Sequence, residues 1–528
     1  MTRAVRLAII MSILAVVVRL ICINQPYIDD WSWRQSDVAA IARNYFQGGF
    51  HFAHPQIDWA GDTPGYVGTE FPILPFVAAI CYKIFGVHEW VGRIQAVILF
   101  AVSLPFFFLL VRKTSGEIAG VWALFFYSFA PLGIMAGRCF MPDMPSLALS
   151  IIGLYFFQRW IDEAGLATGR VRPIGGPDWS TRSTRLRHSY GGQASFFASA
   201  LCIALSILIK LPSAIIGAPL ACLAIERFRI PPLRLGAVFQ RFDLWFFAVI
   251  ALLPAALWYR HAYQIAVQFY PHHFFGAGGV KIMSAAWYLK IAKEIVTSTL
   301  TPFVFVLGGV GALITRTCPE RQSNGSTSSA RPFRWWLATM ILFIVIVGYG
   351  NRHQWYQLPL IPIGAAFAGA ACAFISSKIS SRTVKIVFSI LLAASFSFSA
   401  FVYARDFYRP SAAPLRDAGL KLKATTPTSA LVAASDNGDP TVLYYAERKG
   451  WHFLEKNGIY DGEPRDSAQA IVDLEELRKH GASYLVFTSN TSWWLDYYEQ
   501  LGQYVQRTAT PMDETSEFKI YKLNPVPK

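Results

Sequence analysis

The segment from Tyr27 to Asp37 gathers the residue types that acid–base chemistry requires. Asp29 and Asp30 stand side by side, Arg34 follows them, and Asp37 adds a third carboxylate close to two tryptophans. The segment comes directly after an apolar run, at the point where a helix would leave a bilayer. Acidic groups at a membrane face are costly unless they are solvated, paired or used. A carboxylate, an arginine and aromatic rings in this position suit the polar head group of an anionic lipid.

Each of these carboxylates also has a simpler interpretation. Residues 37–46 predict a short amphipathic helix that lies on the membrane and carries Arg43. Asp37 would stand near the start of that helix, where the helix dipole favours a carboxylate, so it could serve only as an N-terminal cap. Asp29 and Asp30 could equally be solvated residues of a turn.

Four later segments bring further polar groups to the edges of apolar runs. Glu70 directly precedes the apolar stretch 71–85, which is short and contains Pro72 and Pro75, so we expect an interfacial or re-entrant helix there. Glu70 could also be a simple acid at the start of that helix. The other candidates for binding a substrate or its phosphate are Arg138, Asp143, Lys210, Arg352, His353 and Tyr356.

Several of these candidates have alternatives that the sequence leaves open. Arg138 and Asp143 flank a tight turn and could simply pair with each other. Lys210 lies in a two-residue turn, where a lysine either extends to the interface or contacts a lipid phosphate as a point charge. The adjacent His272 and His273 are weak grounds for a metal site, since two histidines alone do not make one.

The composition is that of a membrane protein. The chain has 528 residues, of which 54% are hydrophobic and only 15% charged, which argues against a soluble enzyme. The seven cysteines show no metal-ligand spacing, and we expect no disulfide framework. The net charge of +15 arises in short loops, because residues 404–528 hold about 15 basic and about 17 acidic residues. We therefore expect no nucleic-acid partner.

The apolar runs predict a polytopic α-helical membrane protein with about 11–13 transmembrane helices. Basic residues concentrate in alternate loops, so we expect a cytoplasmic N-terminus, with the long loop 24–92 and the C-terminal region outside the plasma (inner) membrane. The runs span residues 5–23, 93–111, 117–137, 142–160, 194–209, 212–226, 243–259, 296–314, 335–349, 356–375 and 386–403.

After a transmembrane domain of residues 1–403, residues 404–528 predict a small extracytoplasmic α/β domain. Expected strands cover residues 430–434, 484–488 and 518–523, and expected helices cover residues 440–449 and 468–480. The region contains no glycine-rich phosphate loop. We expect it to act as a lid or docking module and not to carry out catalysis.

Taken together, these motifs resemble a superfamily of membrane glycosyltransferases that use polyprenyl-phosphate sugars. It includes the dolichyl-phosphate-mannose protein mannosyltransferases and the aminoarabinose lipid A transferases. The resemblance covers most of the transmembrane domain and is best over residues 1–160. It is carried by Trp33–Asp37, Ile41–Phe46, Glu70–Pro72, Arg138–Asp143 and His353–Pro359.

The resemblance implies that an acid of the first outer loop is the general base at an active site on the outer face. Asp37, Asp30 and Glu70 are then the catalytic candidates, and Arg34 and Arg43 join the substrate-binding candidates named above. The chain departs from the aminoarabinose branch where it has Glu-Phe-Pro at residues 70–72 in place of Glu-Lys-Pro. Lys210, Arg138 or Arg352 would have to take over phosphate binding.

The donor implied by the resemblance is a sugar on polyprenyl phosphate, and the acceptor is a lipid, a glycan or a protein. A carboxylate would take the proton of the acceptor while cations stabilise the departing phosphate. No cofactor follows with certainty, and the need for a divalent metal ion stays open. A flippase or transporter and a glycan ligase or polymerase stay open as alternatives, although few charges lie inside the runs and no internal repeat is visible.

Overall fold

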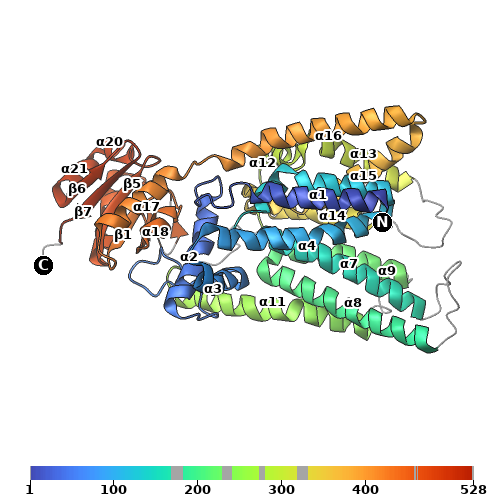
Figure 1. Ribbon diagram of the computed structural model, residues 1–528. Coiled ribbons are helices and arrows are strands. Elements are labelled where there is room, and N and C mark those ends of the chain that lie inside the picture. Colours follow the sequence, from blue (N-terminus) through green and yellow to red (C-terminus); the bar gives the residue numbers. More distant parts are fainter. Residues whose placement is uncertain are drawn as a thin grey trace.

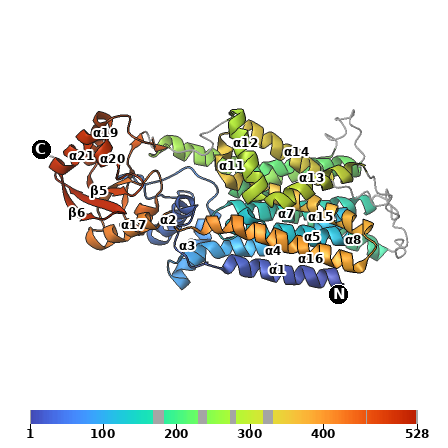
Figure 2. The same ribbon diagram turned by 90° about the horizontal axis from the view of Figure 1, so that it is seen from above.

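The molecule has a helical bundle at one end and a small α/β domain at the other (Figure 1). The loop 24–92, named the first outer loop after its predicted side of the membrane, lies between them. This computed structural model describes residues 2–167, 182–228, 241–272, 280–317, 331–456, 459–460 and 462–525. The second view shows the long helices of the bundle running roughly side by side (Figure 2). The helical bundle and the α/β domain are therefore distinct in space as well as in sequence.

All eleven apolar runs fall largely on helices. The bundle contains α1 (Arg3–Leu20), α4 (Glu89–Ser115), α5 (Glu117–Phe129), α6 (Pro131–Ala136), α7 (Asp143–Ala167), α8 (Arg182–Ile209), α9 (Gly217–Phe228), α11 (Phe242–Gln268), α12 (Ala285–Glu294), α13 (Thr301–Thr317), α14 (Arg331–Ile346), α15 (Leu360–Lys378) and α16 (Arg382–Ala404). Within the described residues, five helices are long and apolar enough to cross a membrane, or six if a pair bent by 103° is one span. The polytopic helical fold is confirmed, and the exact number of crossings stays a prediction.

The outside of the bundle is apolar. Leu252, Leu257, Ile390 and Phe398 are each more than half exposed, and many similar side chains surround them. A protein in water would not leave so much contiguous apolar surface uncovered, so these side chains indicate contact with lipid.

The first outer loop contains two helices that the sequence predicts only in outline. α2 (Ser32–Gly48) begins at Ser32 and has Trp31 at its N-cap, so Asp37 lies in its second turn. The interpretation of Asp37 as an N-terminal cap is therefore wrong. α3 (Ile73–Phe85) has 13 residues and lies within the apolar stretch 71–85, where an interfacial or re-entrant helix is predicted. At 1.5 Å per residue it is too short to cross a hydrocarbon core of about 30 Å.

A buried ion cluster ties the start of this loop to the bundle. The Asp29 carboxylate accepts hydrogen bonds from Arg138 Nη2 at 2.7 Å and from Arg93 Nη2 at 3.2 Å, and all three side chains are fully buried. Asp29 is thus not a solvated turn residue, and Arg138 does not pair with Asp143. Losing any member would leave a buried charge without compensation, which is strongly destabilising.

The C-terminal domain is a five-stranded mixed sheet with helices packed on it. The strand order is β2-β1-β5-β7-β6, in which β1 pairs parallel with β2 and β5, and β7 pairs antiparallel with β5 and β6. The strands are β1 (Leu431–Ser435), β2 (Lys449–His452), β5 (Ala482–Thr488), β6 (Ala509–Glu514) and β7 (Phe518–Leu523), with a small hairpin of β3 (Glu455–Lys456) and β4 (Ile459–Tyr460). The helices are α17 (Ala413–Thr425), α18 (Thr441–Ala446), α19 (Ser467–Lys479), α20 (Trp494–Tyr497) and α21 (Glu499–Thr508).

The first outer loop covers one edge of this sheet, strand β2. The Gly61 N–H donates to the Gly450 carbonyl at 2.7 Å, and the Gly450 N–H donates to the Asp58 carbonyl at 3.0 Å. Side chains reinforce the contact, because the Asp58 carboxylate accepts from Arg43 at 2.5 Å and from Lys449 at 2.7 Å. An uncovered edge strand presents unpaired N–H and C=O groups that can pair with another chain. The loop therefore protects this edge of the sheet, and the strand in turn holds the loop in place.

Replacing Asp58 by asparagine is expected to loosen this contact. Arg43 is almost fully buried and would lose its charged partner, at a cost of about 3–5 kcal/mol. Burial alone would raise the pKa of Asp58, but the charges of Lys449 and Arg43 hold it below its ordinary value. The stabilisation is thus present above about pH 4 and is lost as the pH falls through the lowered pKa.

Thermal unfolding of the purified protein in detergent checks this expectation. At pH 7 the Asp58→Asn variant should unfold at a clearly lower temperature than the wild type, and the difference should shrink below about pH 4. Asp62→Asn is the matched control, because Asp62 lies in the same loop but is exposed and faces His480 at 3.3 Å. Equal unfolding temperatures for wild type and Asp58→Asn would contradict the assignment.

Candidate active site

Two cations and three carboxylates from separate segments meet where the bundle joins the first outer loop. Arg34 contacts Asp37 at 3.0 Å and Glu70 at 2.7 Å through its two terminal nitrogens. The Lys210 ammonium lies 3.3 Å from Glu70 and 3.3 Å from Asp143. These five residues are called the ion network below. Their side chains are between 5 and 14% exposed, so the network is shielded but still reachable.

Local structure explains how each member reaches the network. Arg34 and Asp37 are three residues apart on α2, which places them on one helical face. Asp143 is the first residue of α7, where the helix dipole stabilises a carboxylate. Lys210 has an extended backbone between α8 and the 3₁₀ helix η1 (Leu211–Ile216), whose Pro212 stops the preceding helix. The charges therefore sit at breaks and helix ends and not within the spans.

The charge states of Glu70 and Lys210 follow from their surroundings. Burial alone would raise the pKa of Glu70, but the charges of Arg34 and Lys210 and a hydrogen bond from Arg34 lower it well below its usual range. Burial would lower the pKa of Lys210, but Asp143, Tyr356 and Glu70 raise it above its usual value. Both groups are charged at neutral pH, and Glu70 is a poor proton acceptor.

Asp37 is held differently from Glu70. One of its carboxylate oxygens accepts from Arg34 and the other accepts from the indole N–H of Trp59 at 3.1 Å. Asp30, by contrast, is exposed and lies outside the network, with its backbone N–H directed at the Phe407 carbonyl at 3.4 Å. Although the residue is exposed, neighbouring groups shield its carboxyl partly from water, and this desolvation together with the charge of Asp29 raises the pKa of Asp30. Of the sequence-predicted bases, Asp37 and Glu70 both lie in the network, but Asp37 pairs with one cation there and Glu70 with two.

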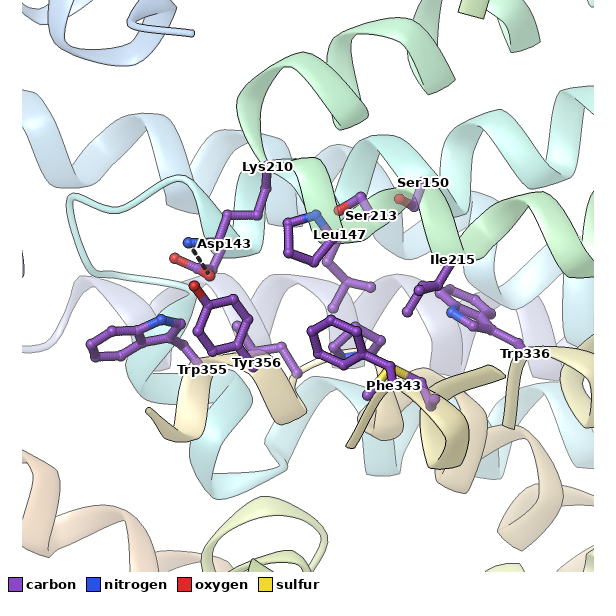
Figure 3. Close-up of a pocket in the computed structure, with 14 residues that line it drawn as sticks. Asp143, Leu147, Ser150, Lys210, Ser213, Ile215, Trp336, Phe343, Trp355 and Tyr356 are labelled. Carbon is purple, nitrogen blue, oxygen red and sulfur yellow. Dashed lines mark ion pairs between the residues drawn. The ribbon is translucent and has the colours of Figure 1, made fainter. Parts of the chain in front are cut away.

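Two cavities border the ion network. The first has an empty volume of about 450 Å³, which includes space open to solvent, and has Lys210 and Asp143 in its wall. Figure 3 shows these two polar groups at one end of the cavity and Trp336 at the other, with Phe343 along the side. The wall is otherwise largely apolar and also includes Leu147, Ile215, Met340, Trp355 and Leu358.

The second cavity has an empty volume of about 350 Å³, again including space open to solvent, and has Arg34 and Glu70 in its wall beside Val38, Ile41 and Leu74. Because Glu70 pairs with Lys210, the ion network joins the two cavities. Each cavity is thus mainly apolar and has a charged end at the same place.

Among the described residues, one oxygen of the Asp143 carboxylate has no hydrogen-bond partner. Asp143 Oδ1 faces Lys210, whereas Asp143 Oδ2 is buried and makes no hydrogen bond within the described part of the chain. An unsatisfied buried acceptor costs free energy unless a ligand or water supplies a donor. Its place in the wall of the first cavity indicates a position for a donor group of a bound molecule.

Aromatic side chains form one side of the site. His353 lies between the 3₁₀ helices η3 (Gly350–Arg352) and η4 (Gln354–Gln357) and stacks on Trp355, with ring centres 4.5 Å apart and planes 4° apart. Burial and, to a smaller extent, the charges of Arg352, Lys210 and Arg34 together lower the pKa of His353 to about 3, so the ring is neutral at pH 7. Lys210 Nζ lies 4.9 Å from the centre of the Tyr356 ring.

The structure therefore divides the sequence-predicted residues into two groups. Arg34, Asp37, Glu70, Asp143 and Lys210 form the network. His353 and Tyr356 lie beside it, and the exposed Arg352 is hydrogen-bonded to His353 at 3.2 Å. Arg43 and Arg138 lie elsewhere, in the contact with Asp58 and in the cluster around Asp29. Trp59 belongs to the site but was missed, because an aromatic residue in a glycine- and proline-rich loop carries no spacing signal.

Within the described residues, no group of three or more histidine, cysteine, aspartate or glutamate side chains could hold a metal ion. Of the adjacent histidine pair, His273 lies outside the described residues. The Nδ1 atom of His272 is hydrogen-bonded to the Ala266 carbonyl at 3.2 Å.

Comparisons with known proteins agree with the resemblance noted from the sequence. Residues 63–167 match the family model described as dolichyl-phosphate-mannose-protein mannosyltransferase. A search of curated protein sequences finds no match. The matched segment holds Glu70 and Asp143, two members of the ion network.

Solved structures share the fold at low sequence identity. The crystal structure of ArnT from Cupriavidus metallidurans bound to undecaprenyl phosphate aligns with a TM-score of 0.61 and 14% identity, covering 97% of each chain. The oligosaccharyltransferase AglB from Archaeoglobus fulgidus, in complex with an inhibitory peptide and a dolichol-phosphate, aligns with a TM-score of 0.57 and 14% identity. That alignment covers 99% of this chain and 74% of the other. The chain thus has the membrane fold of these lipid-phosphate-binding proteins.

Proposed function

We propose that this multi-pass membrane protein transfers a sugar from a polyprenyl-phosphate donor to an acceptor at the outer face of the plasma (inner) membrane. In this orientation the N-terminus is cytoplasmic and the C-terminal domain is extracytoplasmic. The observation that carries the proposal is the ion network at the charged end of an apolar cavity. A lipid-linked phosphate needs this combination, because it has a long apolar chain and one anionic group.

The first cavity suits the donor. Its apolar wall would contact the first isoprenoid units, and Lys210 and Arg34 would face the phosphate. The two 3.3 Å contacts of Lys210 are longer than the 2.7–2.9 Å usual for charged partners, so its ammonium is loosely shared and can turn to a third anion. Undecaprenyl phosphate and dolichol-phosphate in the two fold relatives support a lipid phosphate as the ligand.

The chemistry assigned to the network is a single displacement. The acceptor, entering by the second cavity, loses a proton from its hydroxyl or amine to the Asp37 carboxylate as its oxygen or nitrogen bonds to the anomeric carbon. The bond from that carbon to the phosphate oxygen breaks, and polyprenyl phosphate leaves with the bonding electron pair. Lys210 and Arg34 stabilise the charge that develops on the phosphate. A single displacement inverts the anomeric centre.

Glu70 and Asp143 have supporting roles in this proposal. Glu70 stays ionised between two cations and therefore positions Arg34 and Lys210 without taking a proton. The free oxygen of Asp143 would accept a hydrogen bond from a hydroxyl or amine of the donor sugar.

A donor panel tests the proposal. The purified protein in lipid nanodiscs would be offered a membrane extract as acceptor and labelled sugars on polyprenyl monophosphate, on polyprenyl diphosphate or on a nucleotide. We expect the release of free polyprenyl phosphate from a monophosphate donor and no consumption of the nucleotide sugar. Consumption of the nucleotide sugar, or of the diphosphate alone, would contradict the assignment of the first cavity.

A further inference from the structure

Trp59 connects the C-terminal domain to the ion network. It lies between the two backbone hydrogen bonds that Asp58 and Gly61 make with Gly450 of the edge strand β2. These bonds hold the loop against the strand as an additional partner of the sheet edge. Gly61 allows the close approach, because its φ is +61° and a side chain there would collide with the Trp451 ring.

The C-terminal domain contacts the indole ring of Trp59 through His452. Its centre lies 5.1 Å from the imidazole centre of His452, the last residue of β2, with planes 39° apart. His452 is in turn fixed by Asp436, whose carboxylate lies 2.8 Å from Nδ1, and both side chains are buried. Two buried groups of the soluble domain thus determine where the Trp59 ring lies.

The N–H of the same indole ring is hydrogen-bonded to Asp37. The Trp59 N–H donates to one carboxylate oxygen at 3.1 Å while Arg34 donates to the second at 3.0 Å. Two donors on two oxygens fix both the plane and the direction of a carboxylate. Each oxygen keeps a second lone pair that can accept a proton.

We infer that Trp59 is a positioning residue through which the docked C-terminal domain sets the orientation of Asp37. The inference rests on the proposed function, because it assumes that Asp37 accepts the proton of the acceptor. It assigns to the domain a part in forming the active site, beyond the lid or docking role expected from the sequence.

The test is the Trp59→Phe variant, which keeps an aromatic ring against His452 and removes the N–H. A hydrogen bond to a charged group in a shielded site is worth enough to lower kcat by about tenfold or more. The KM for the polyprenyl-phosphate donor should stay within about twofold, since the phosphate contacts of Lys210 and Arg34 are unchanged. Trp493→Phe is the matched control, because Trp493 also donates its N–H within the described chain, to the Asn490 carbonyl at 2.9 Å, but lies in the C-terminal domain near α20.

A second comparison separates positioning from a general loss of structure. Adding Trp59→Phe to Asp37→Asn should leave the residual rate unchanged, because the carboxylate that Trp59 orients is already gone. A structural defect would instead lower the rate of both backgrounds by the same factor and would overturn the inference.

The inference and the proposed function fail in different ways. Wild-type kcat in Trp59→Phe, together with loss of activity in Asp37→Asn, would overturn the positioning role alone. Wild-type kcat in Asp37→Asn would overturn the assignment of the base on which the inference rests.

Discussion

Replacing Lys210 by methionine lowers kcat/KM for the polyprenyl-phosphate donor by at least about 100-fold in our account. The substitution keeps an unbranched, apolar chain of similar length and removes the one ammonium shared by Glu70 and Asp143. The two carboxylates would then repel each other and the incoming phosphate. The loss should fall largely on donor binding, as a raised KM.

Steady-state kinetics with a polyprenyl-phosphate sugar measure this effect. Lys290→Met is the matched control, because Lys290 is an exposed lysine of α12 outside the ion network. The control should retain wild-type kinetics. A Lys210→Met protein that is folded and binds the donor with unchanged KM would show that the phosphate does not sit at this lysine.

Replacing Asp37 by asparagine is expected to lower kcat by roughly 10²- to 10⁴-fold, the usual contribution of a general base. Asparagine has the same shape and can still accept from Trp59, so the site should remain assembled. Donor binding should therefore persist while transfer is lost. The measurement is single-turnover transfer at saturating donor, combined with a binding assay for polyprenyl phosphate.

Asp30→Asn distinguishes the two aspartates that the sequence could not separate. Asp30 is exposed and lies outside the ion network, so this variant should transfer at nearly the wild-type rate. If Asp30→Asn loses activity while Asp37→Asn retains it, the base lies in the turn before α2 and not in the network.

The sequence predicts the membrane-side residues well because charge next to an apolar run is costly and therefore informative. Lys210 and Asp143 stand at the ends of long apolar runs, and both lie in the ion network. Arg138 carries the same signal, yet it compensates the buried charge of Asp29. A local pattern reveals that a charge needs a partner but not which partner, because Arg138 and Asp29 are 109 residues apart.

In the first outer loop and the C-terminal domain, local sequence patterns do not predict the features that depend on contacts between distant segments. The sequence predicts β1, β5 and β7 from their apolar runs, whereas β2 is a four-residue strand, Lys-Gly-Trp-His, without apolar alternation. That strand is held by parallel pairing with β1 and by the outer loop. The role of Trp59 depends on this same long-range pairing, so neither feature could be predicted before the loop and the domain were seen together.

One measurement tests the central claim most directly: the fate of a doubly labelled donor in proteoliposomes, with separate labels on the sugar and on the polyprenyl chain. The account predicts that free polyprenyl phosphate and sugar-bearing acceptor appear in equal amounts, and that neither appears with Asp37→Asn. Movement of the intact donor between leaflets, with both labels still joined, would identify a flippase and contradict the account.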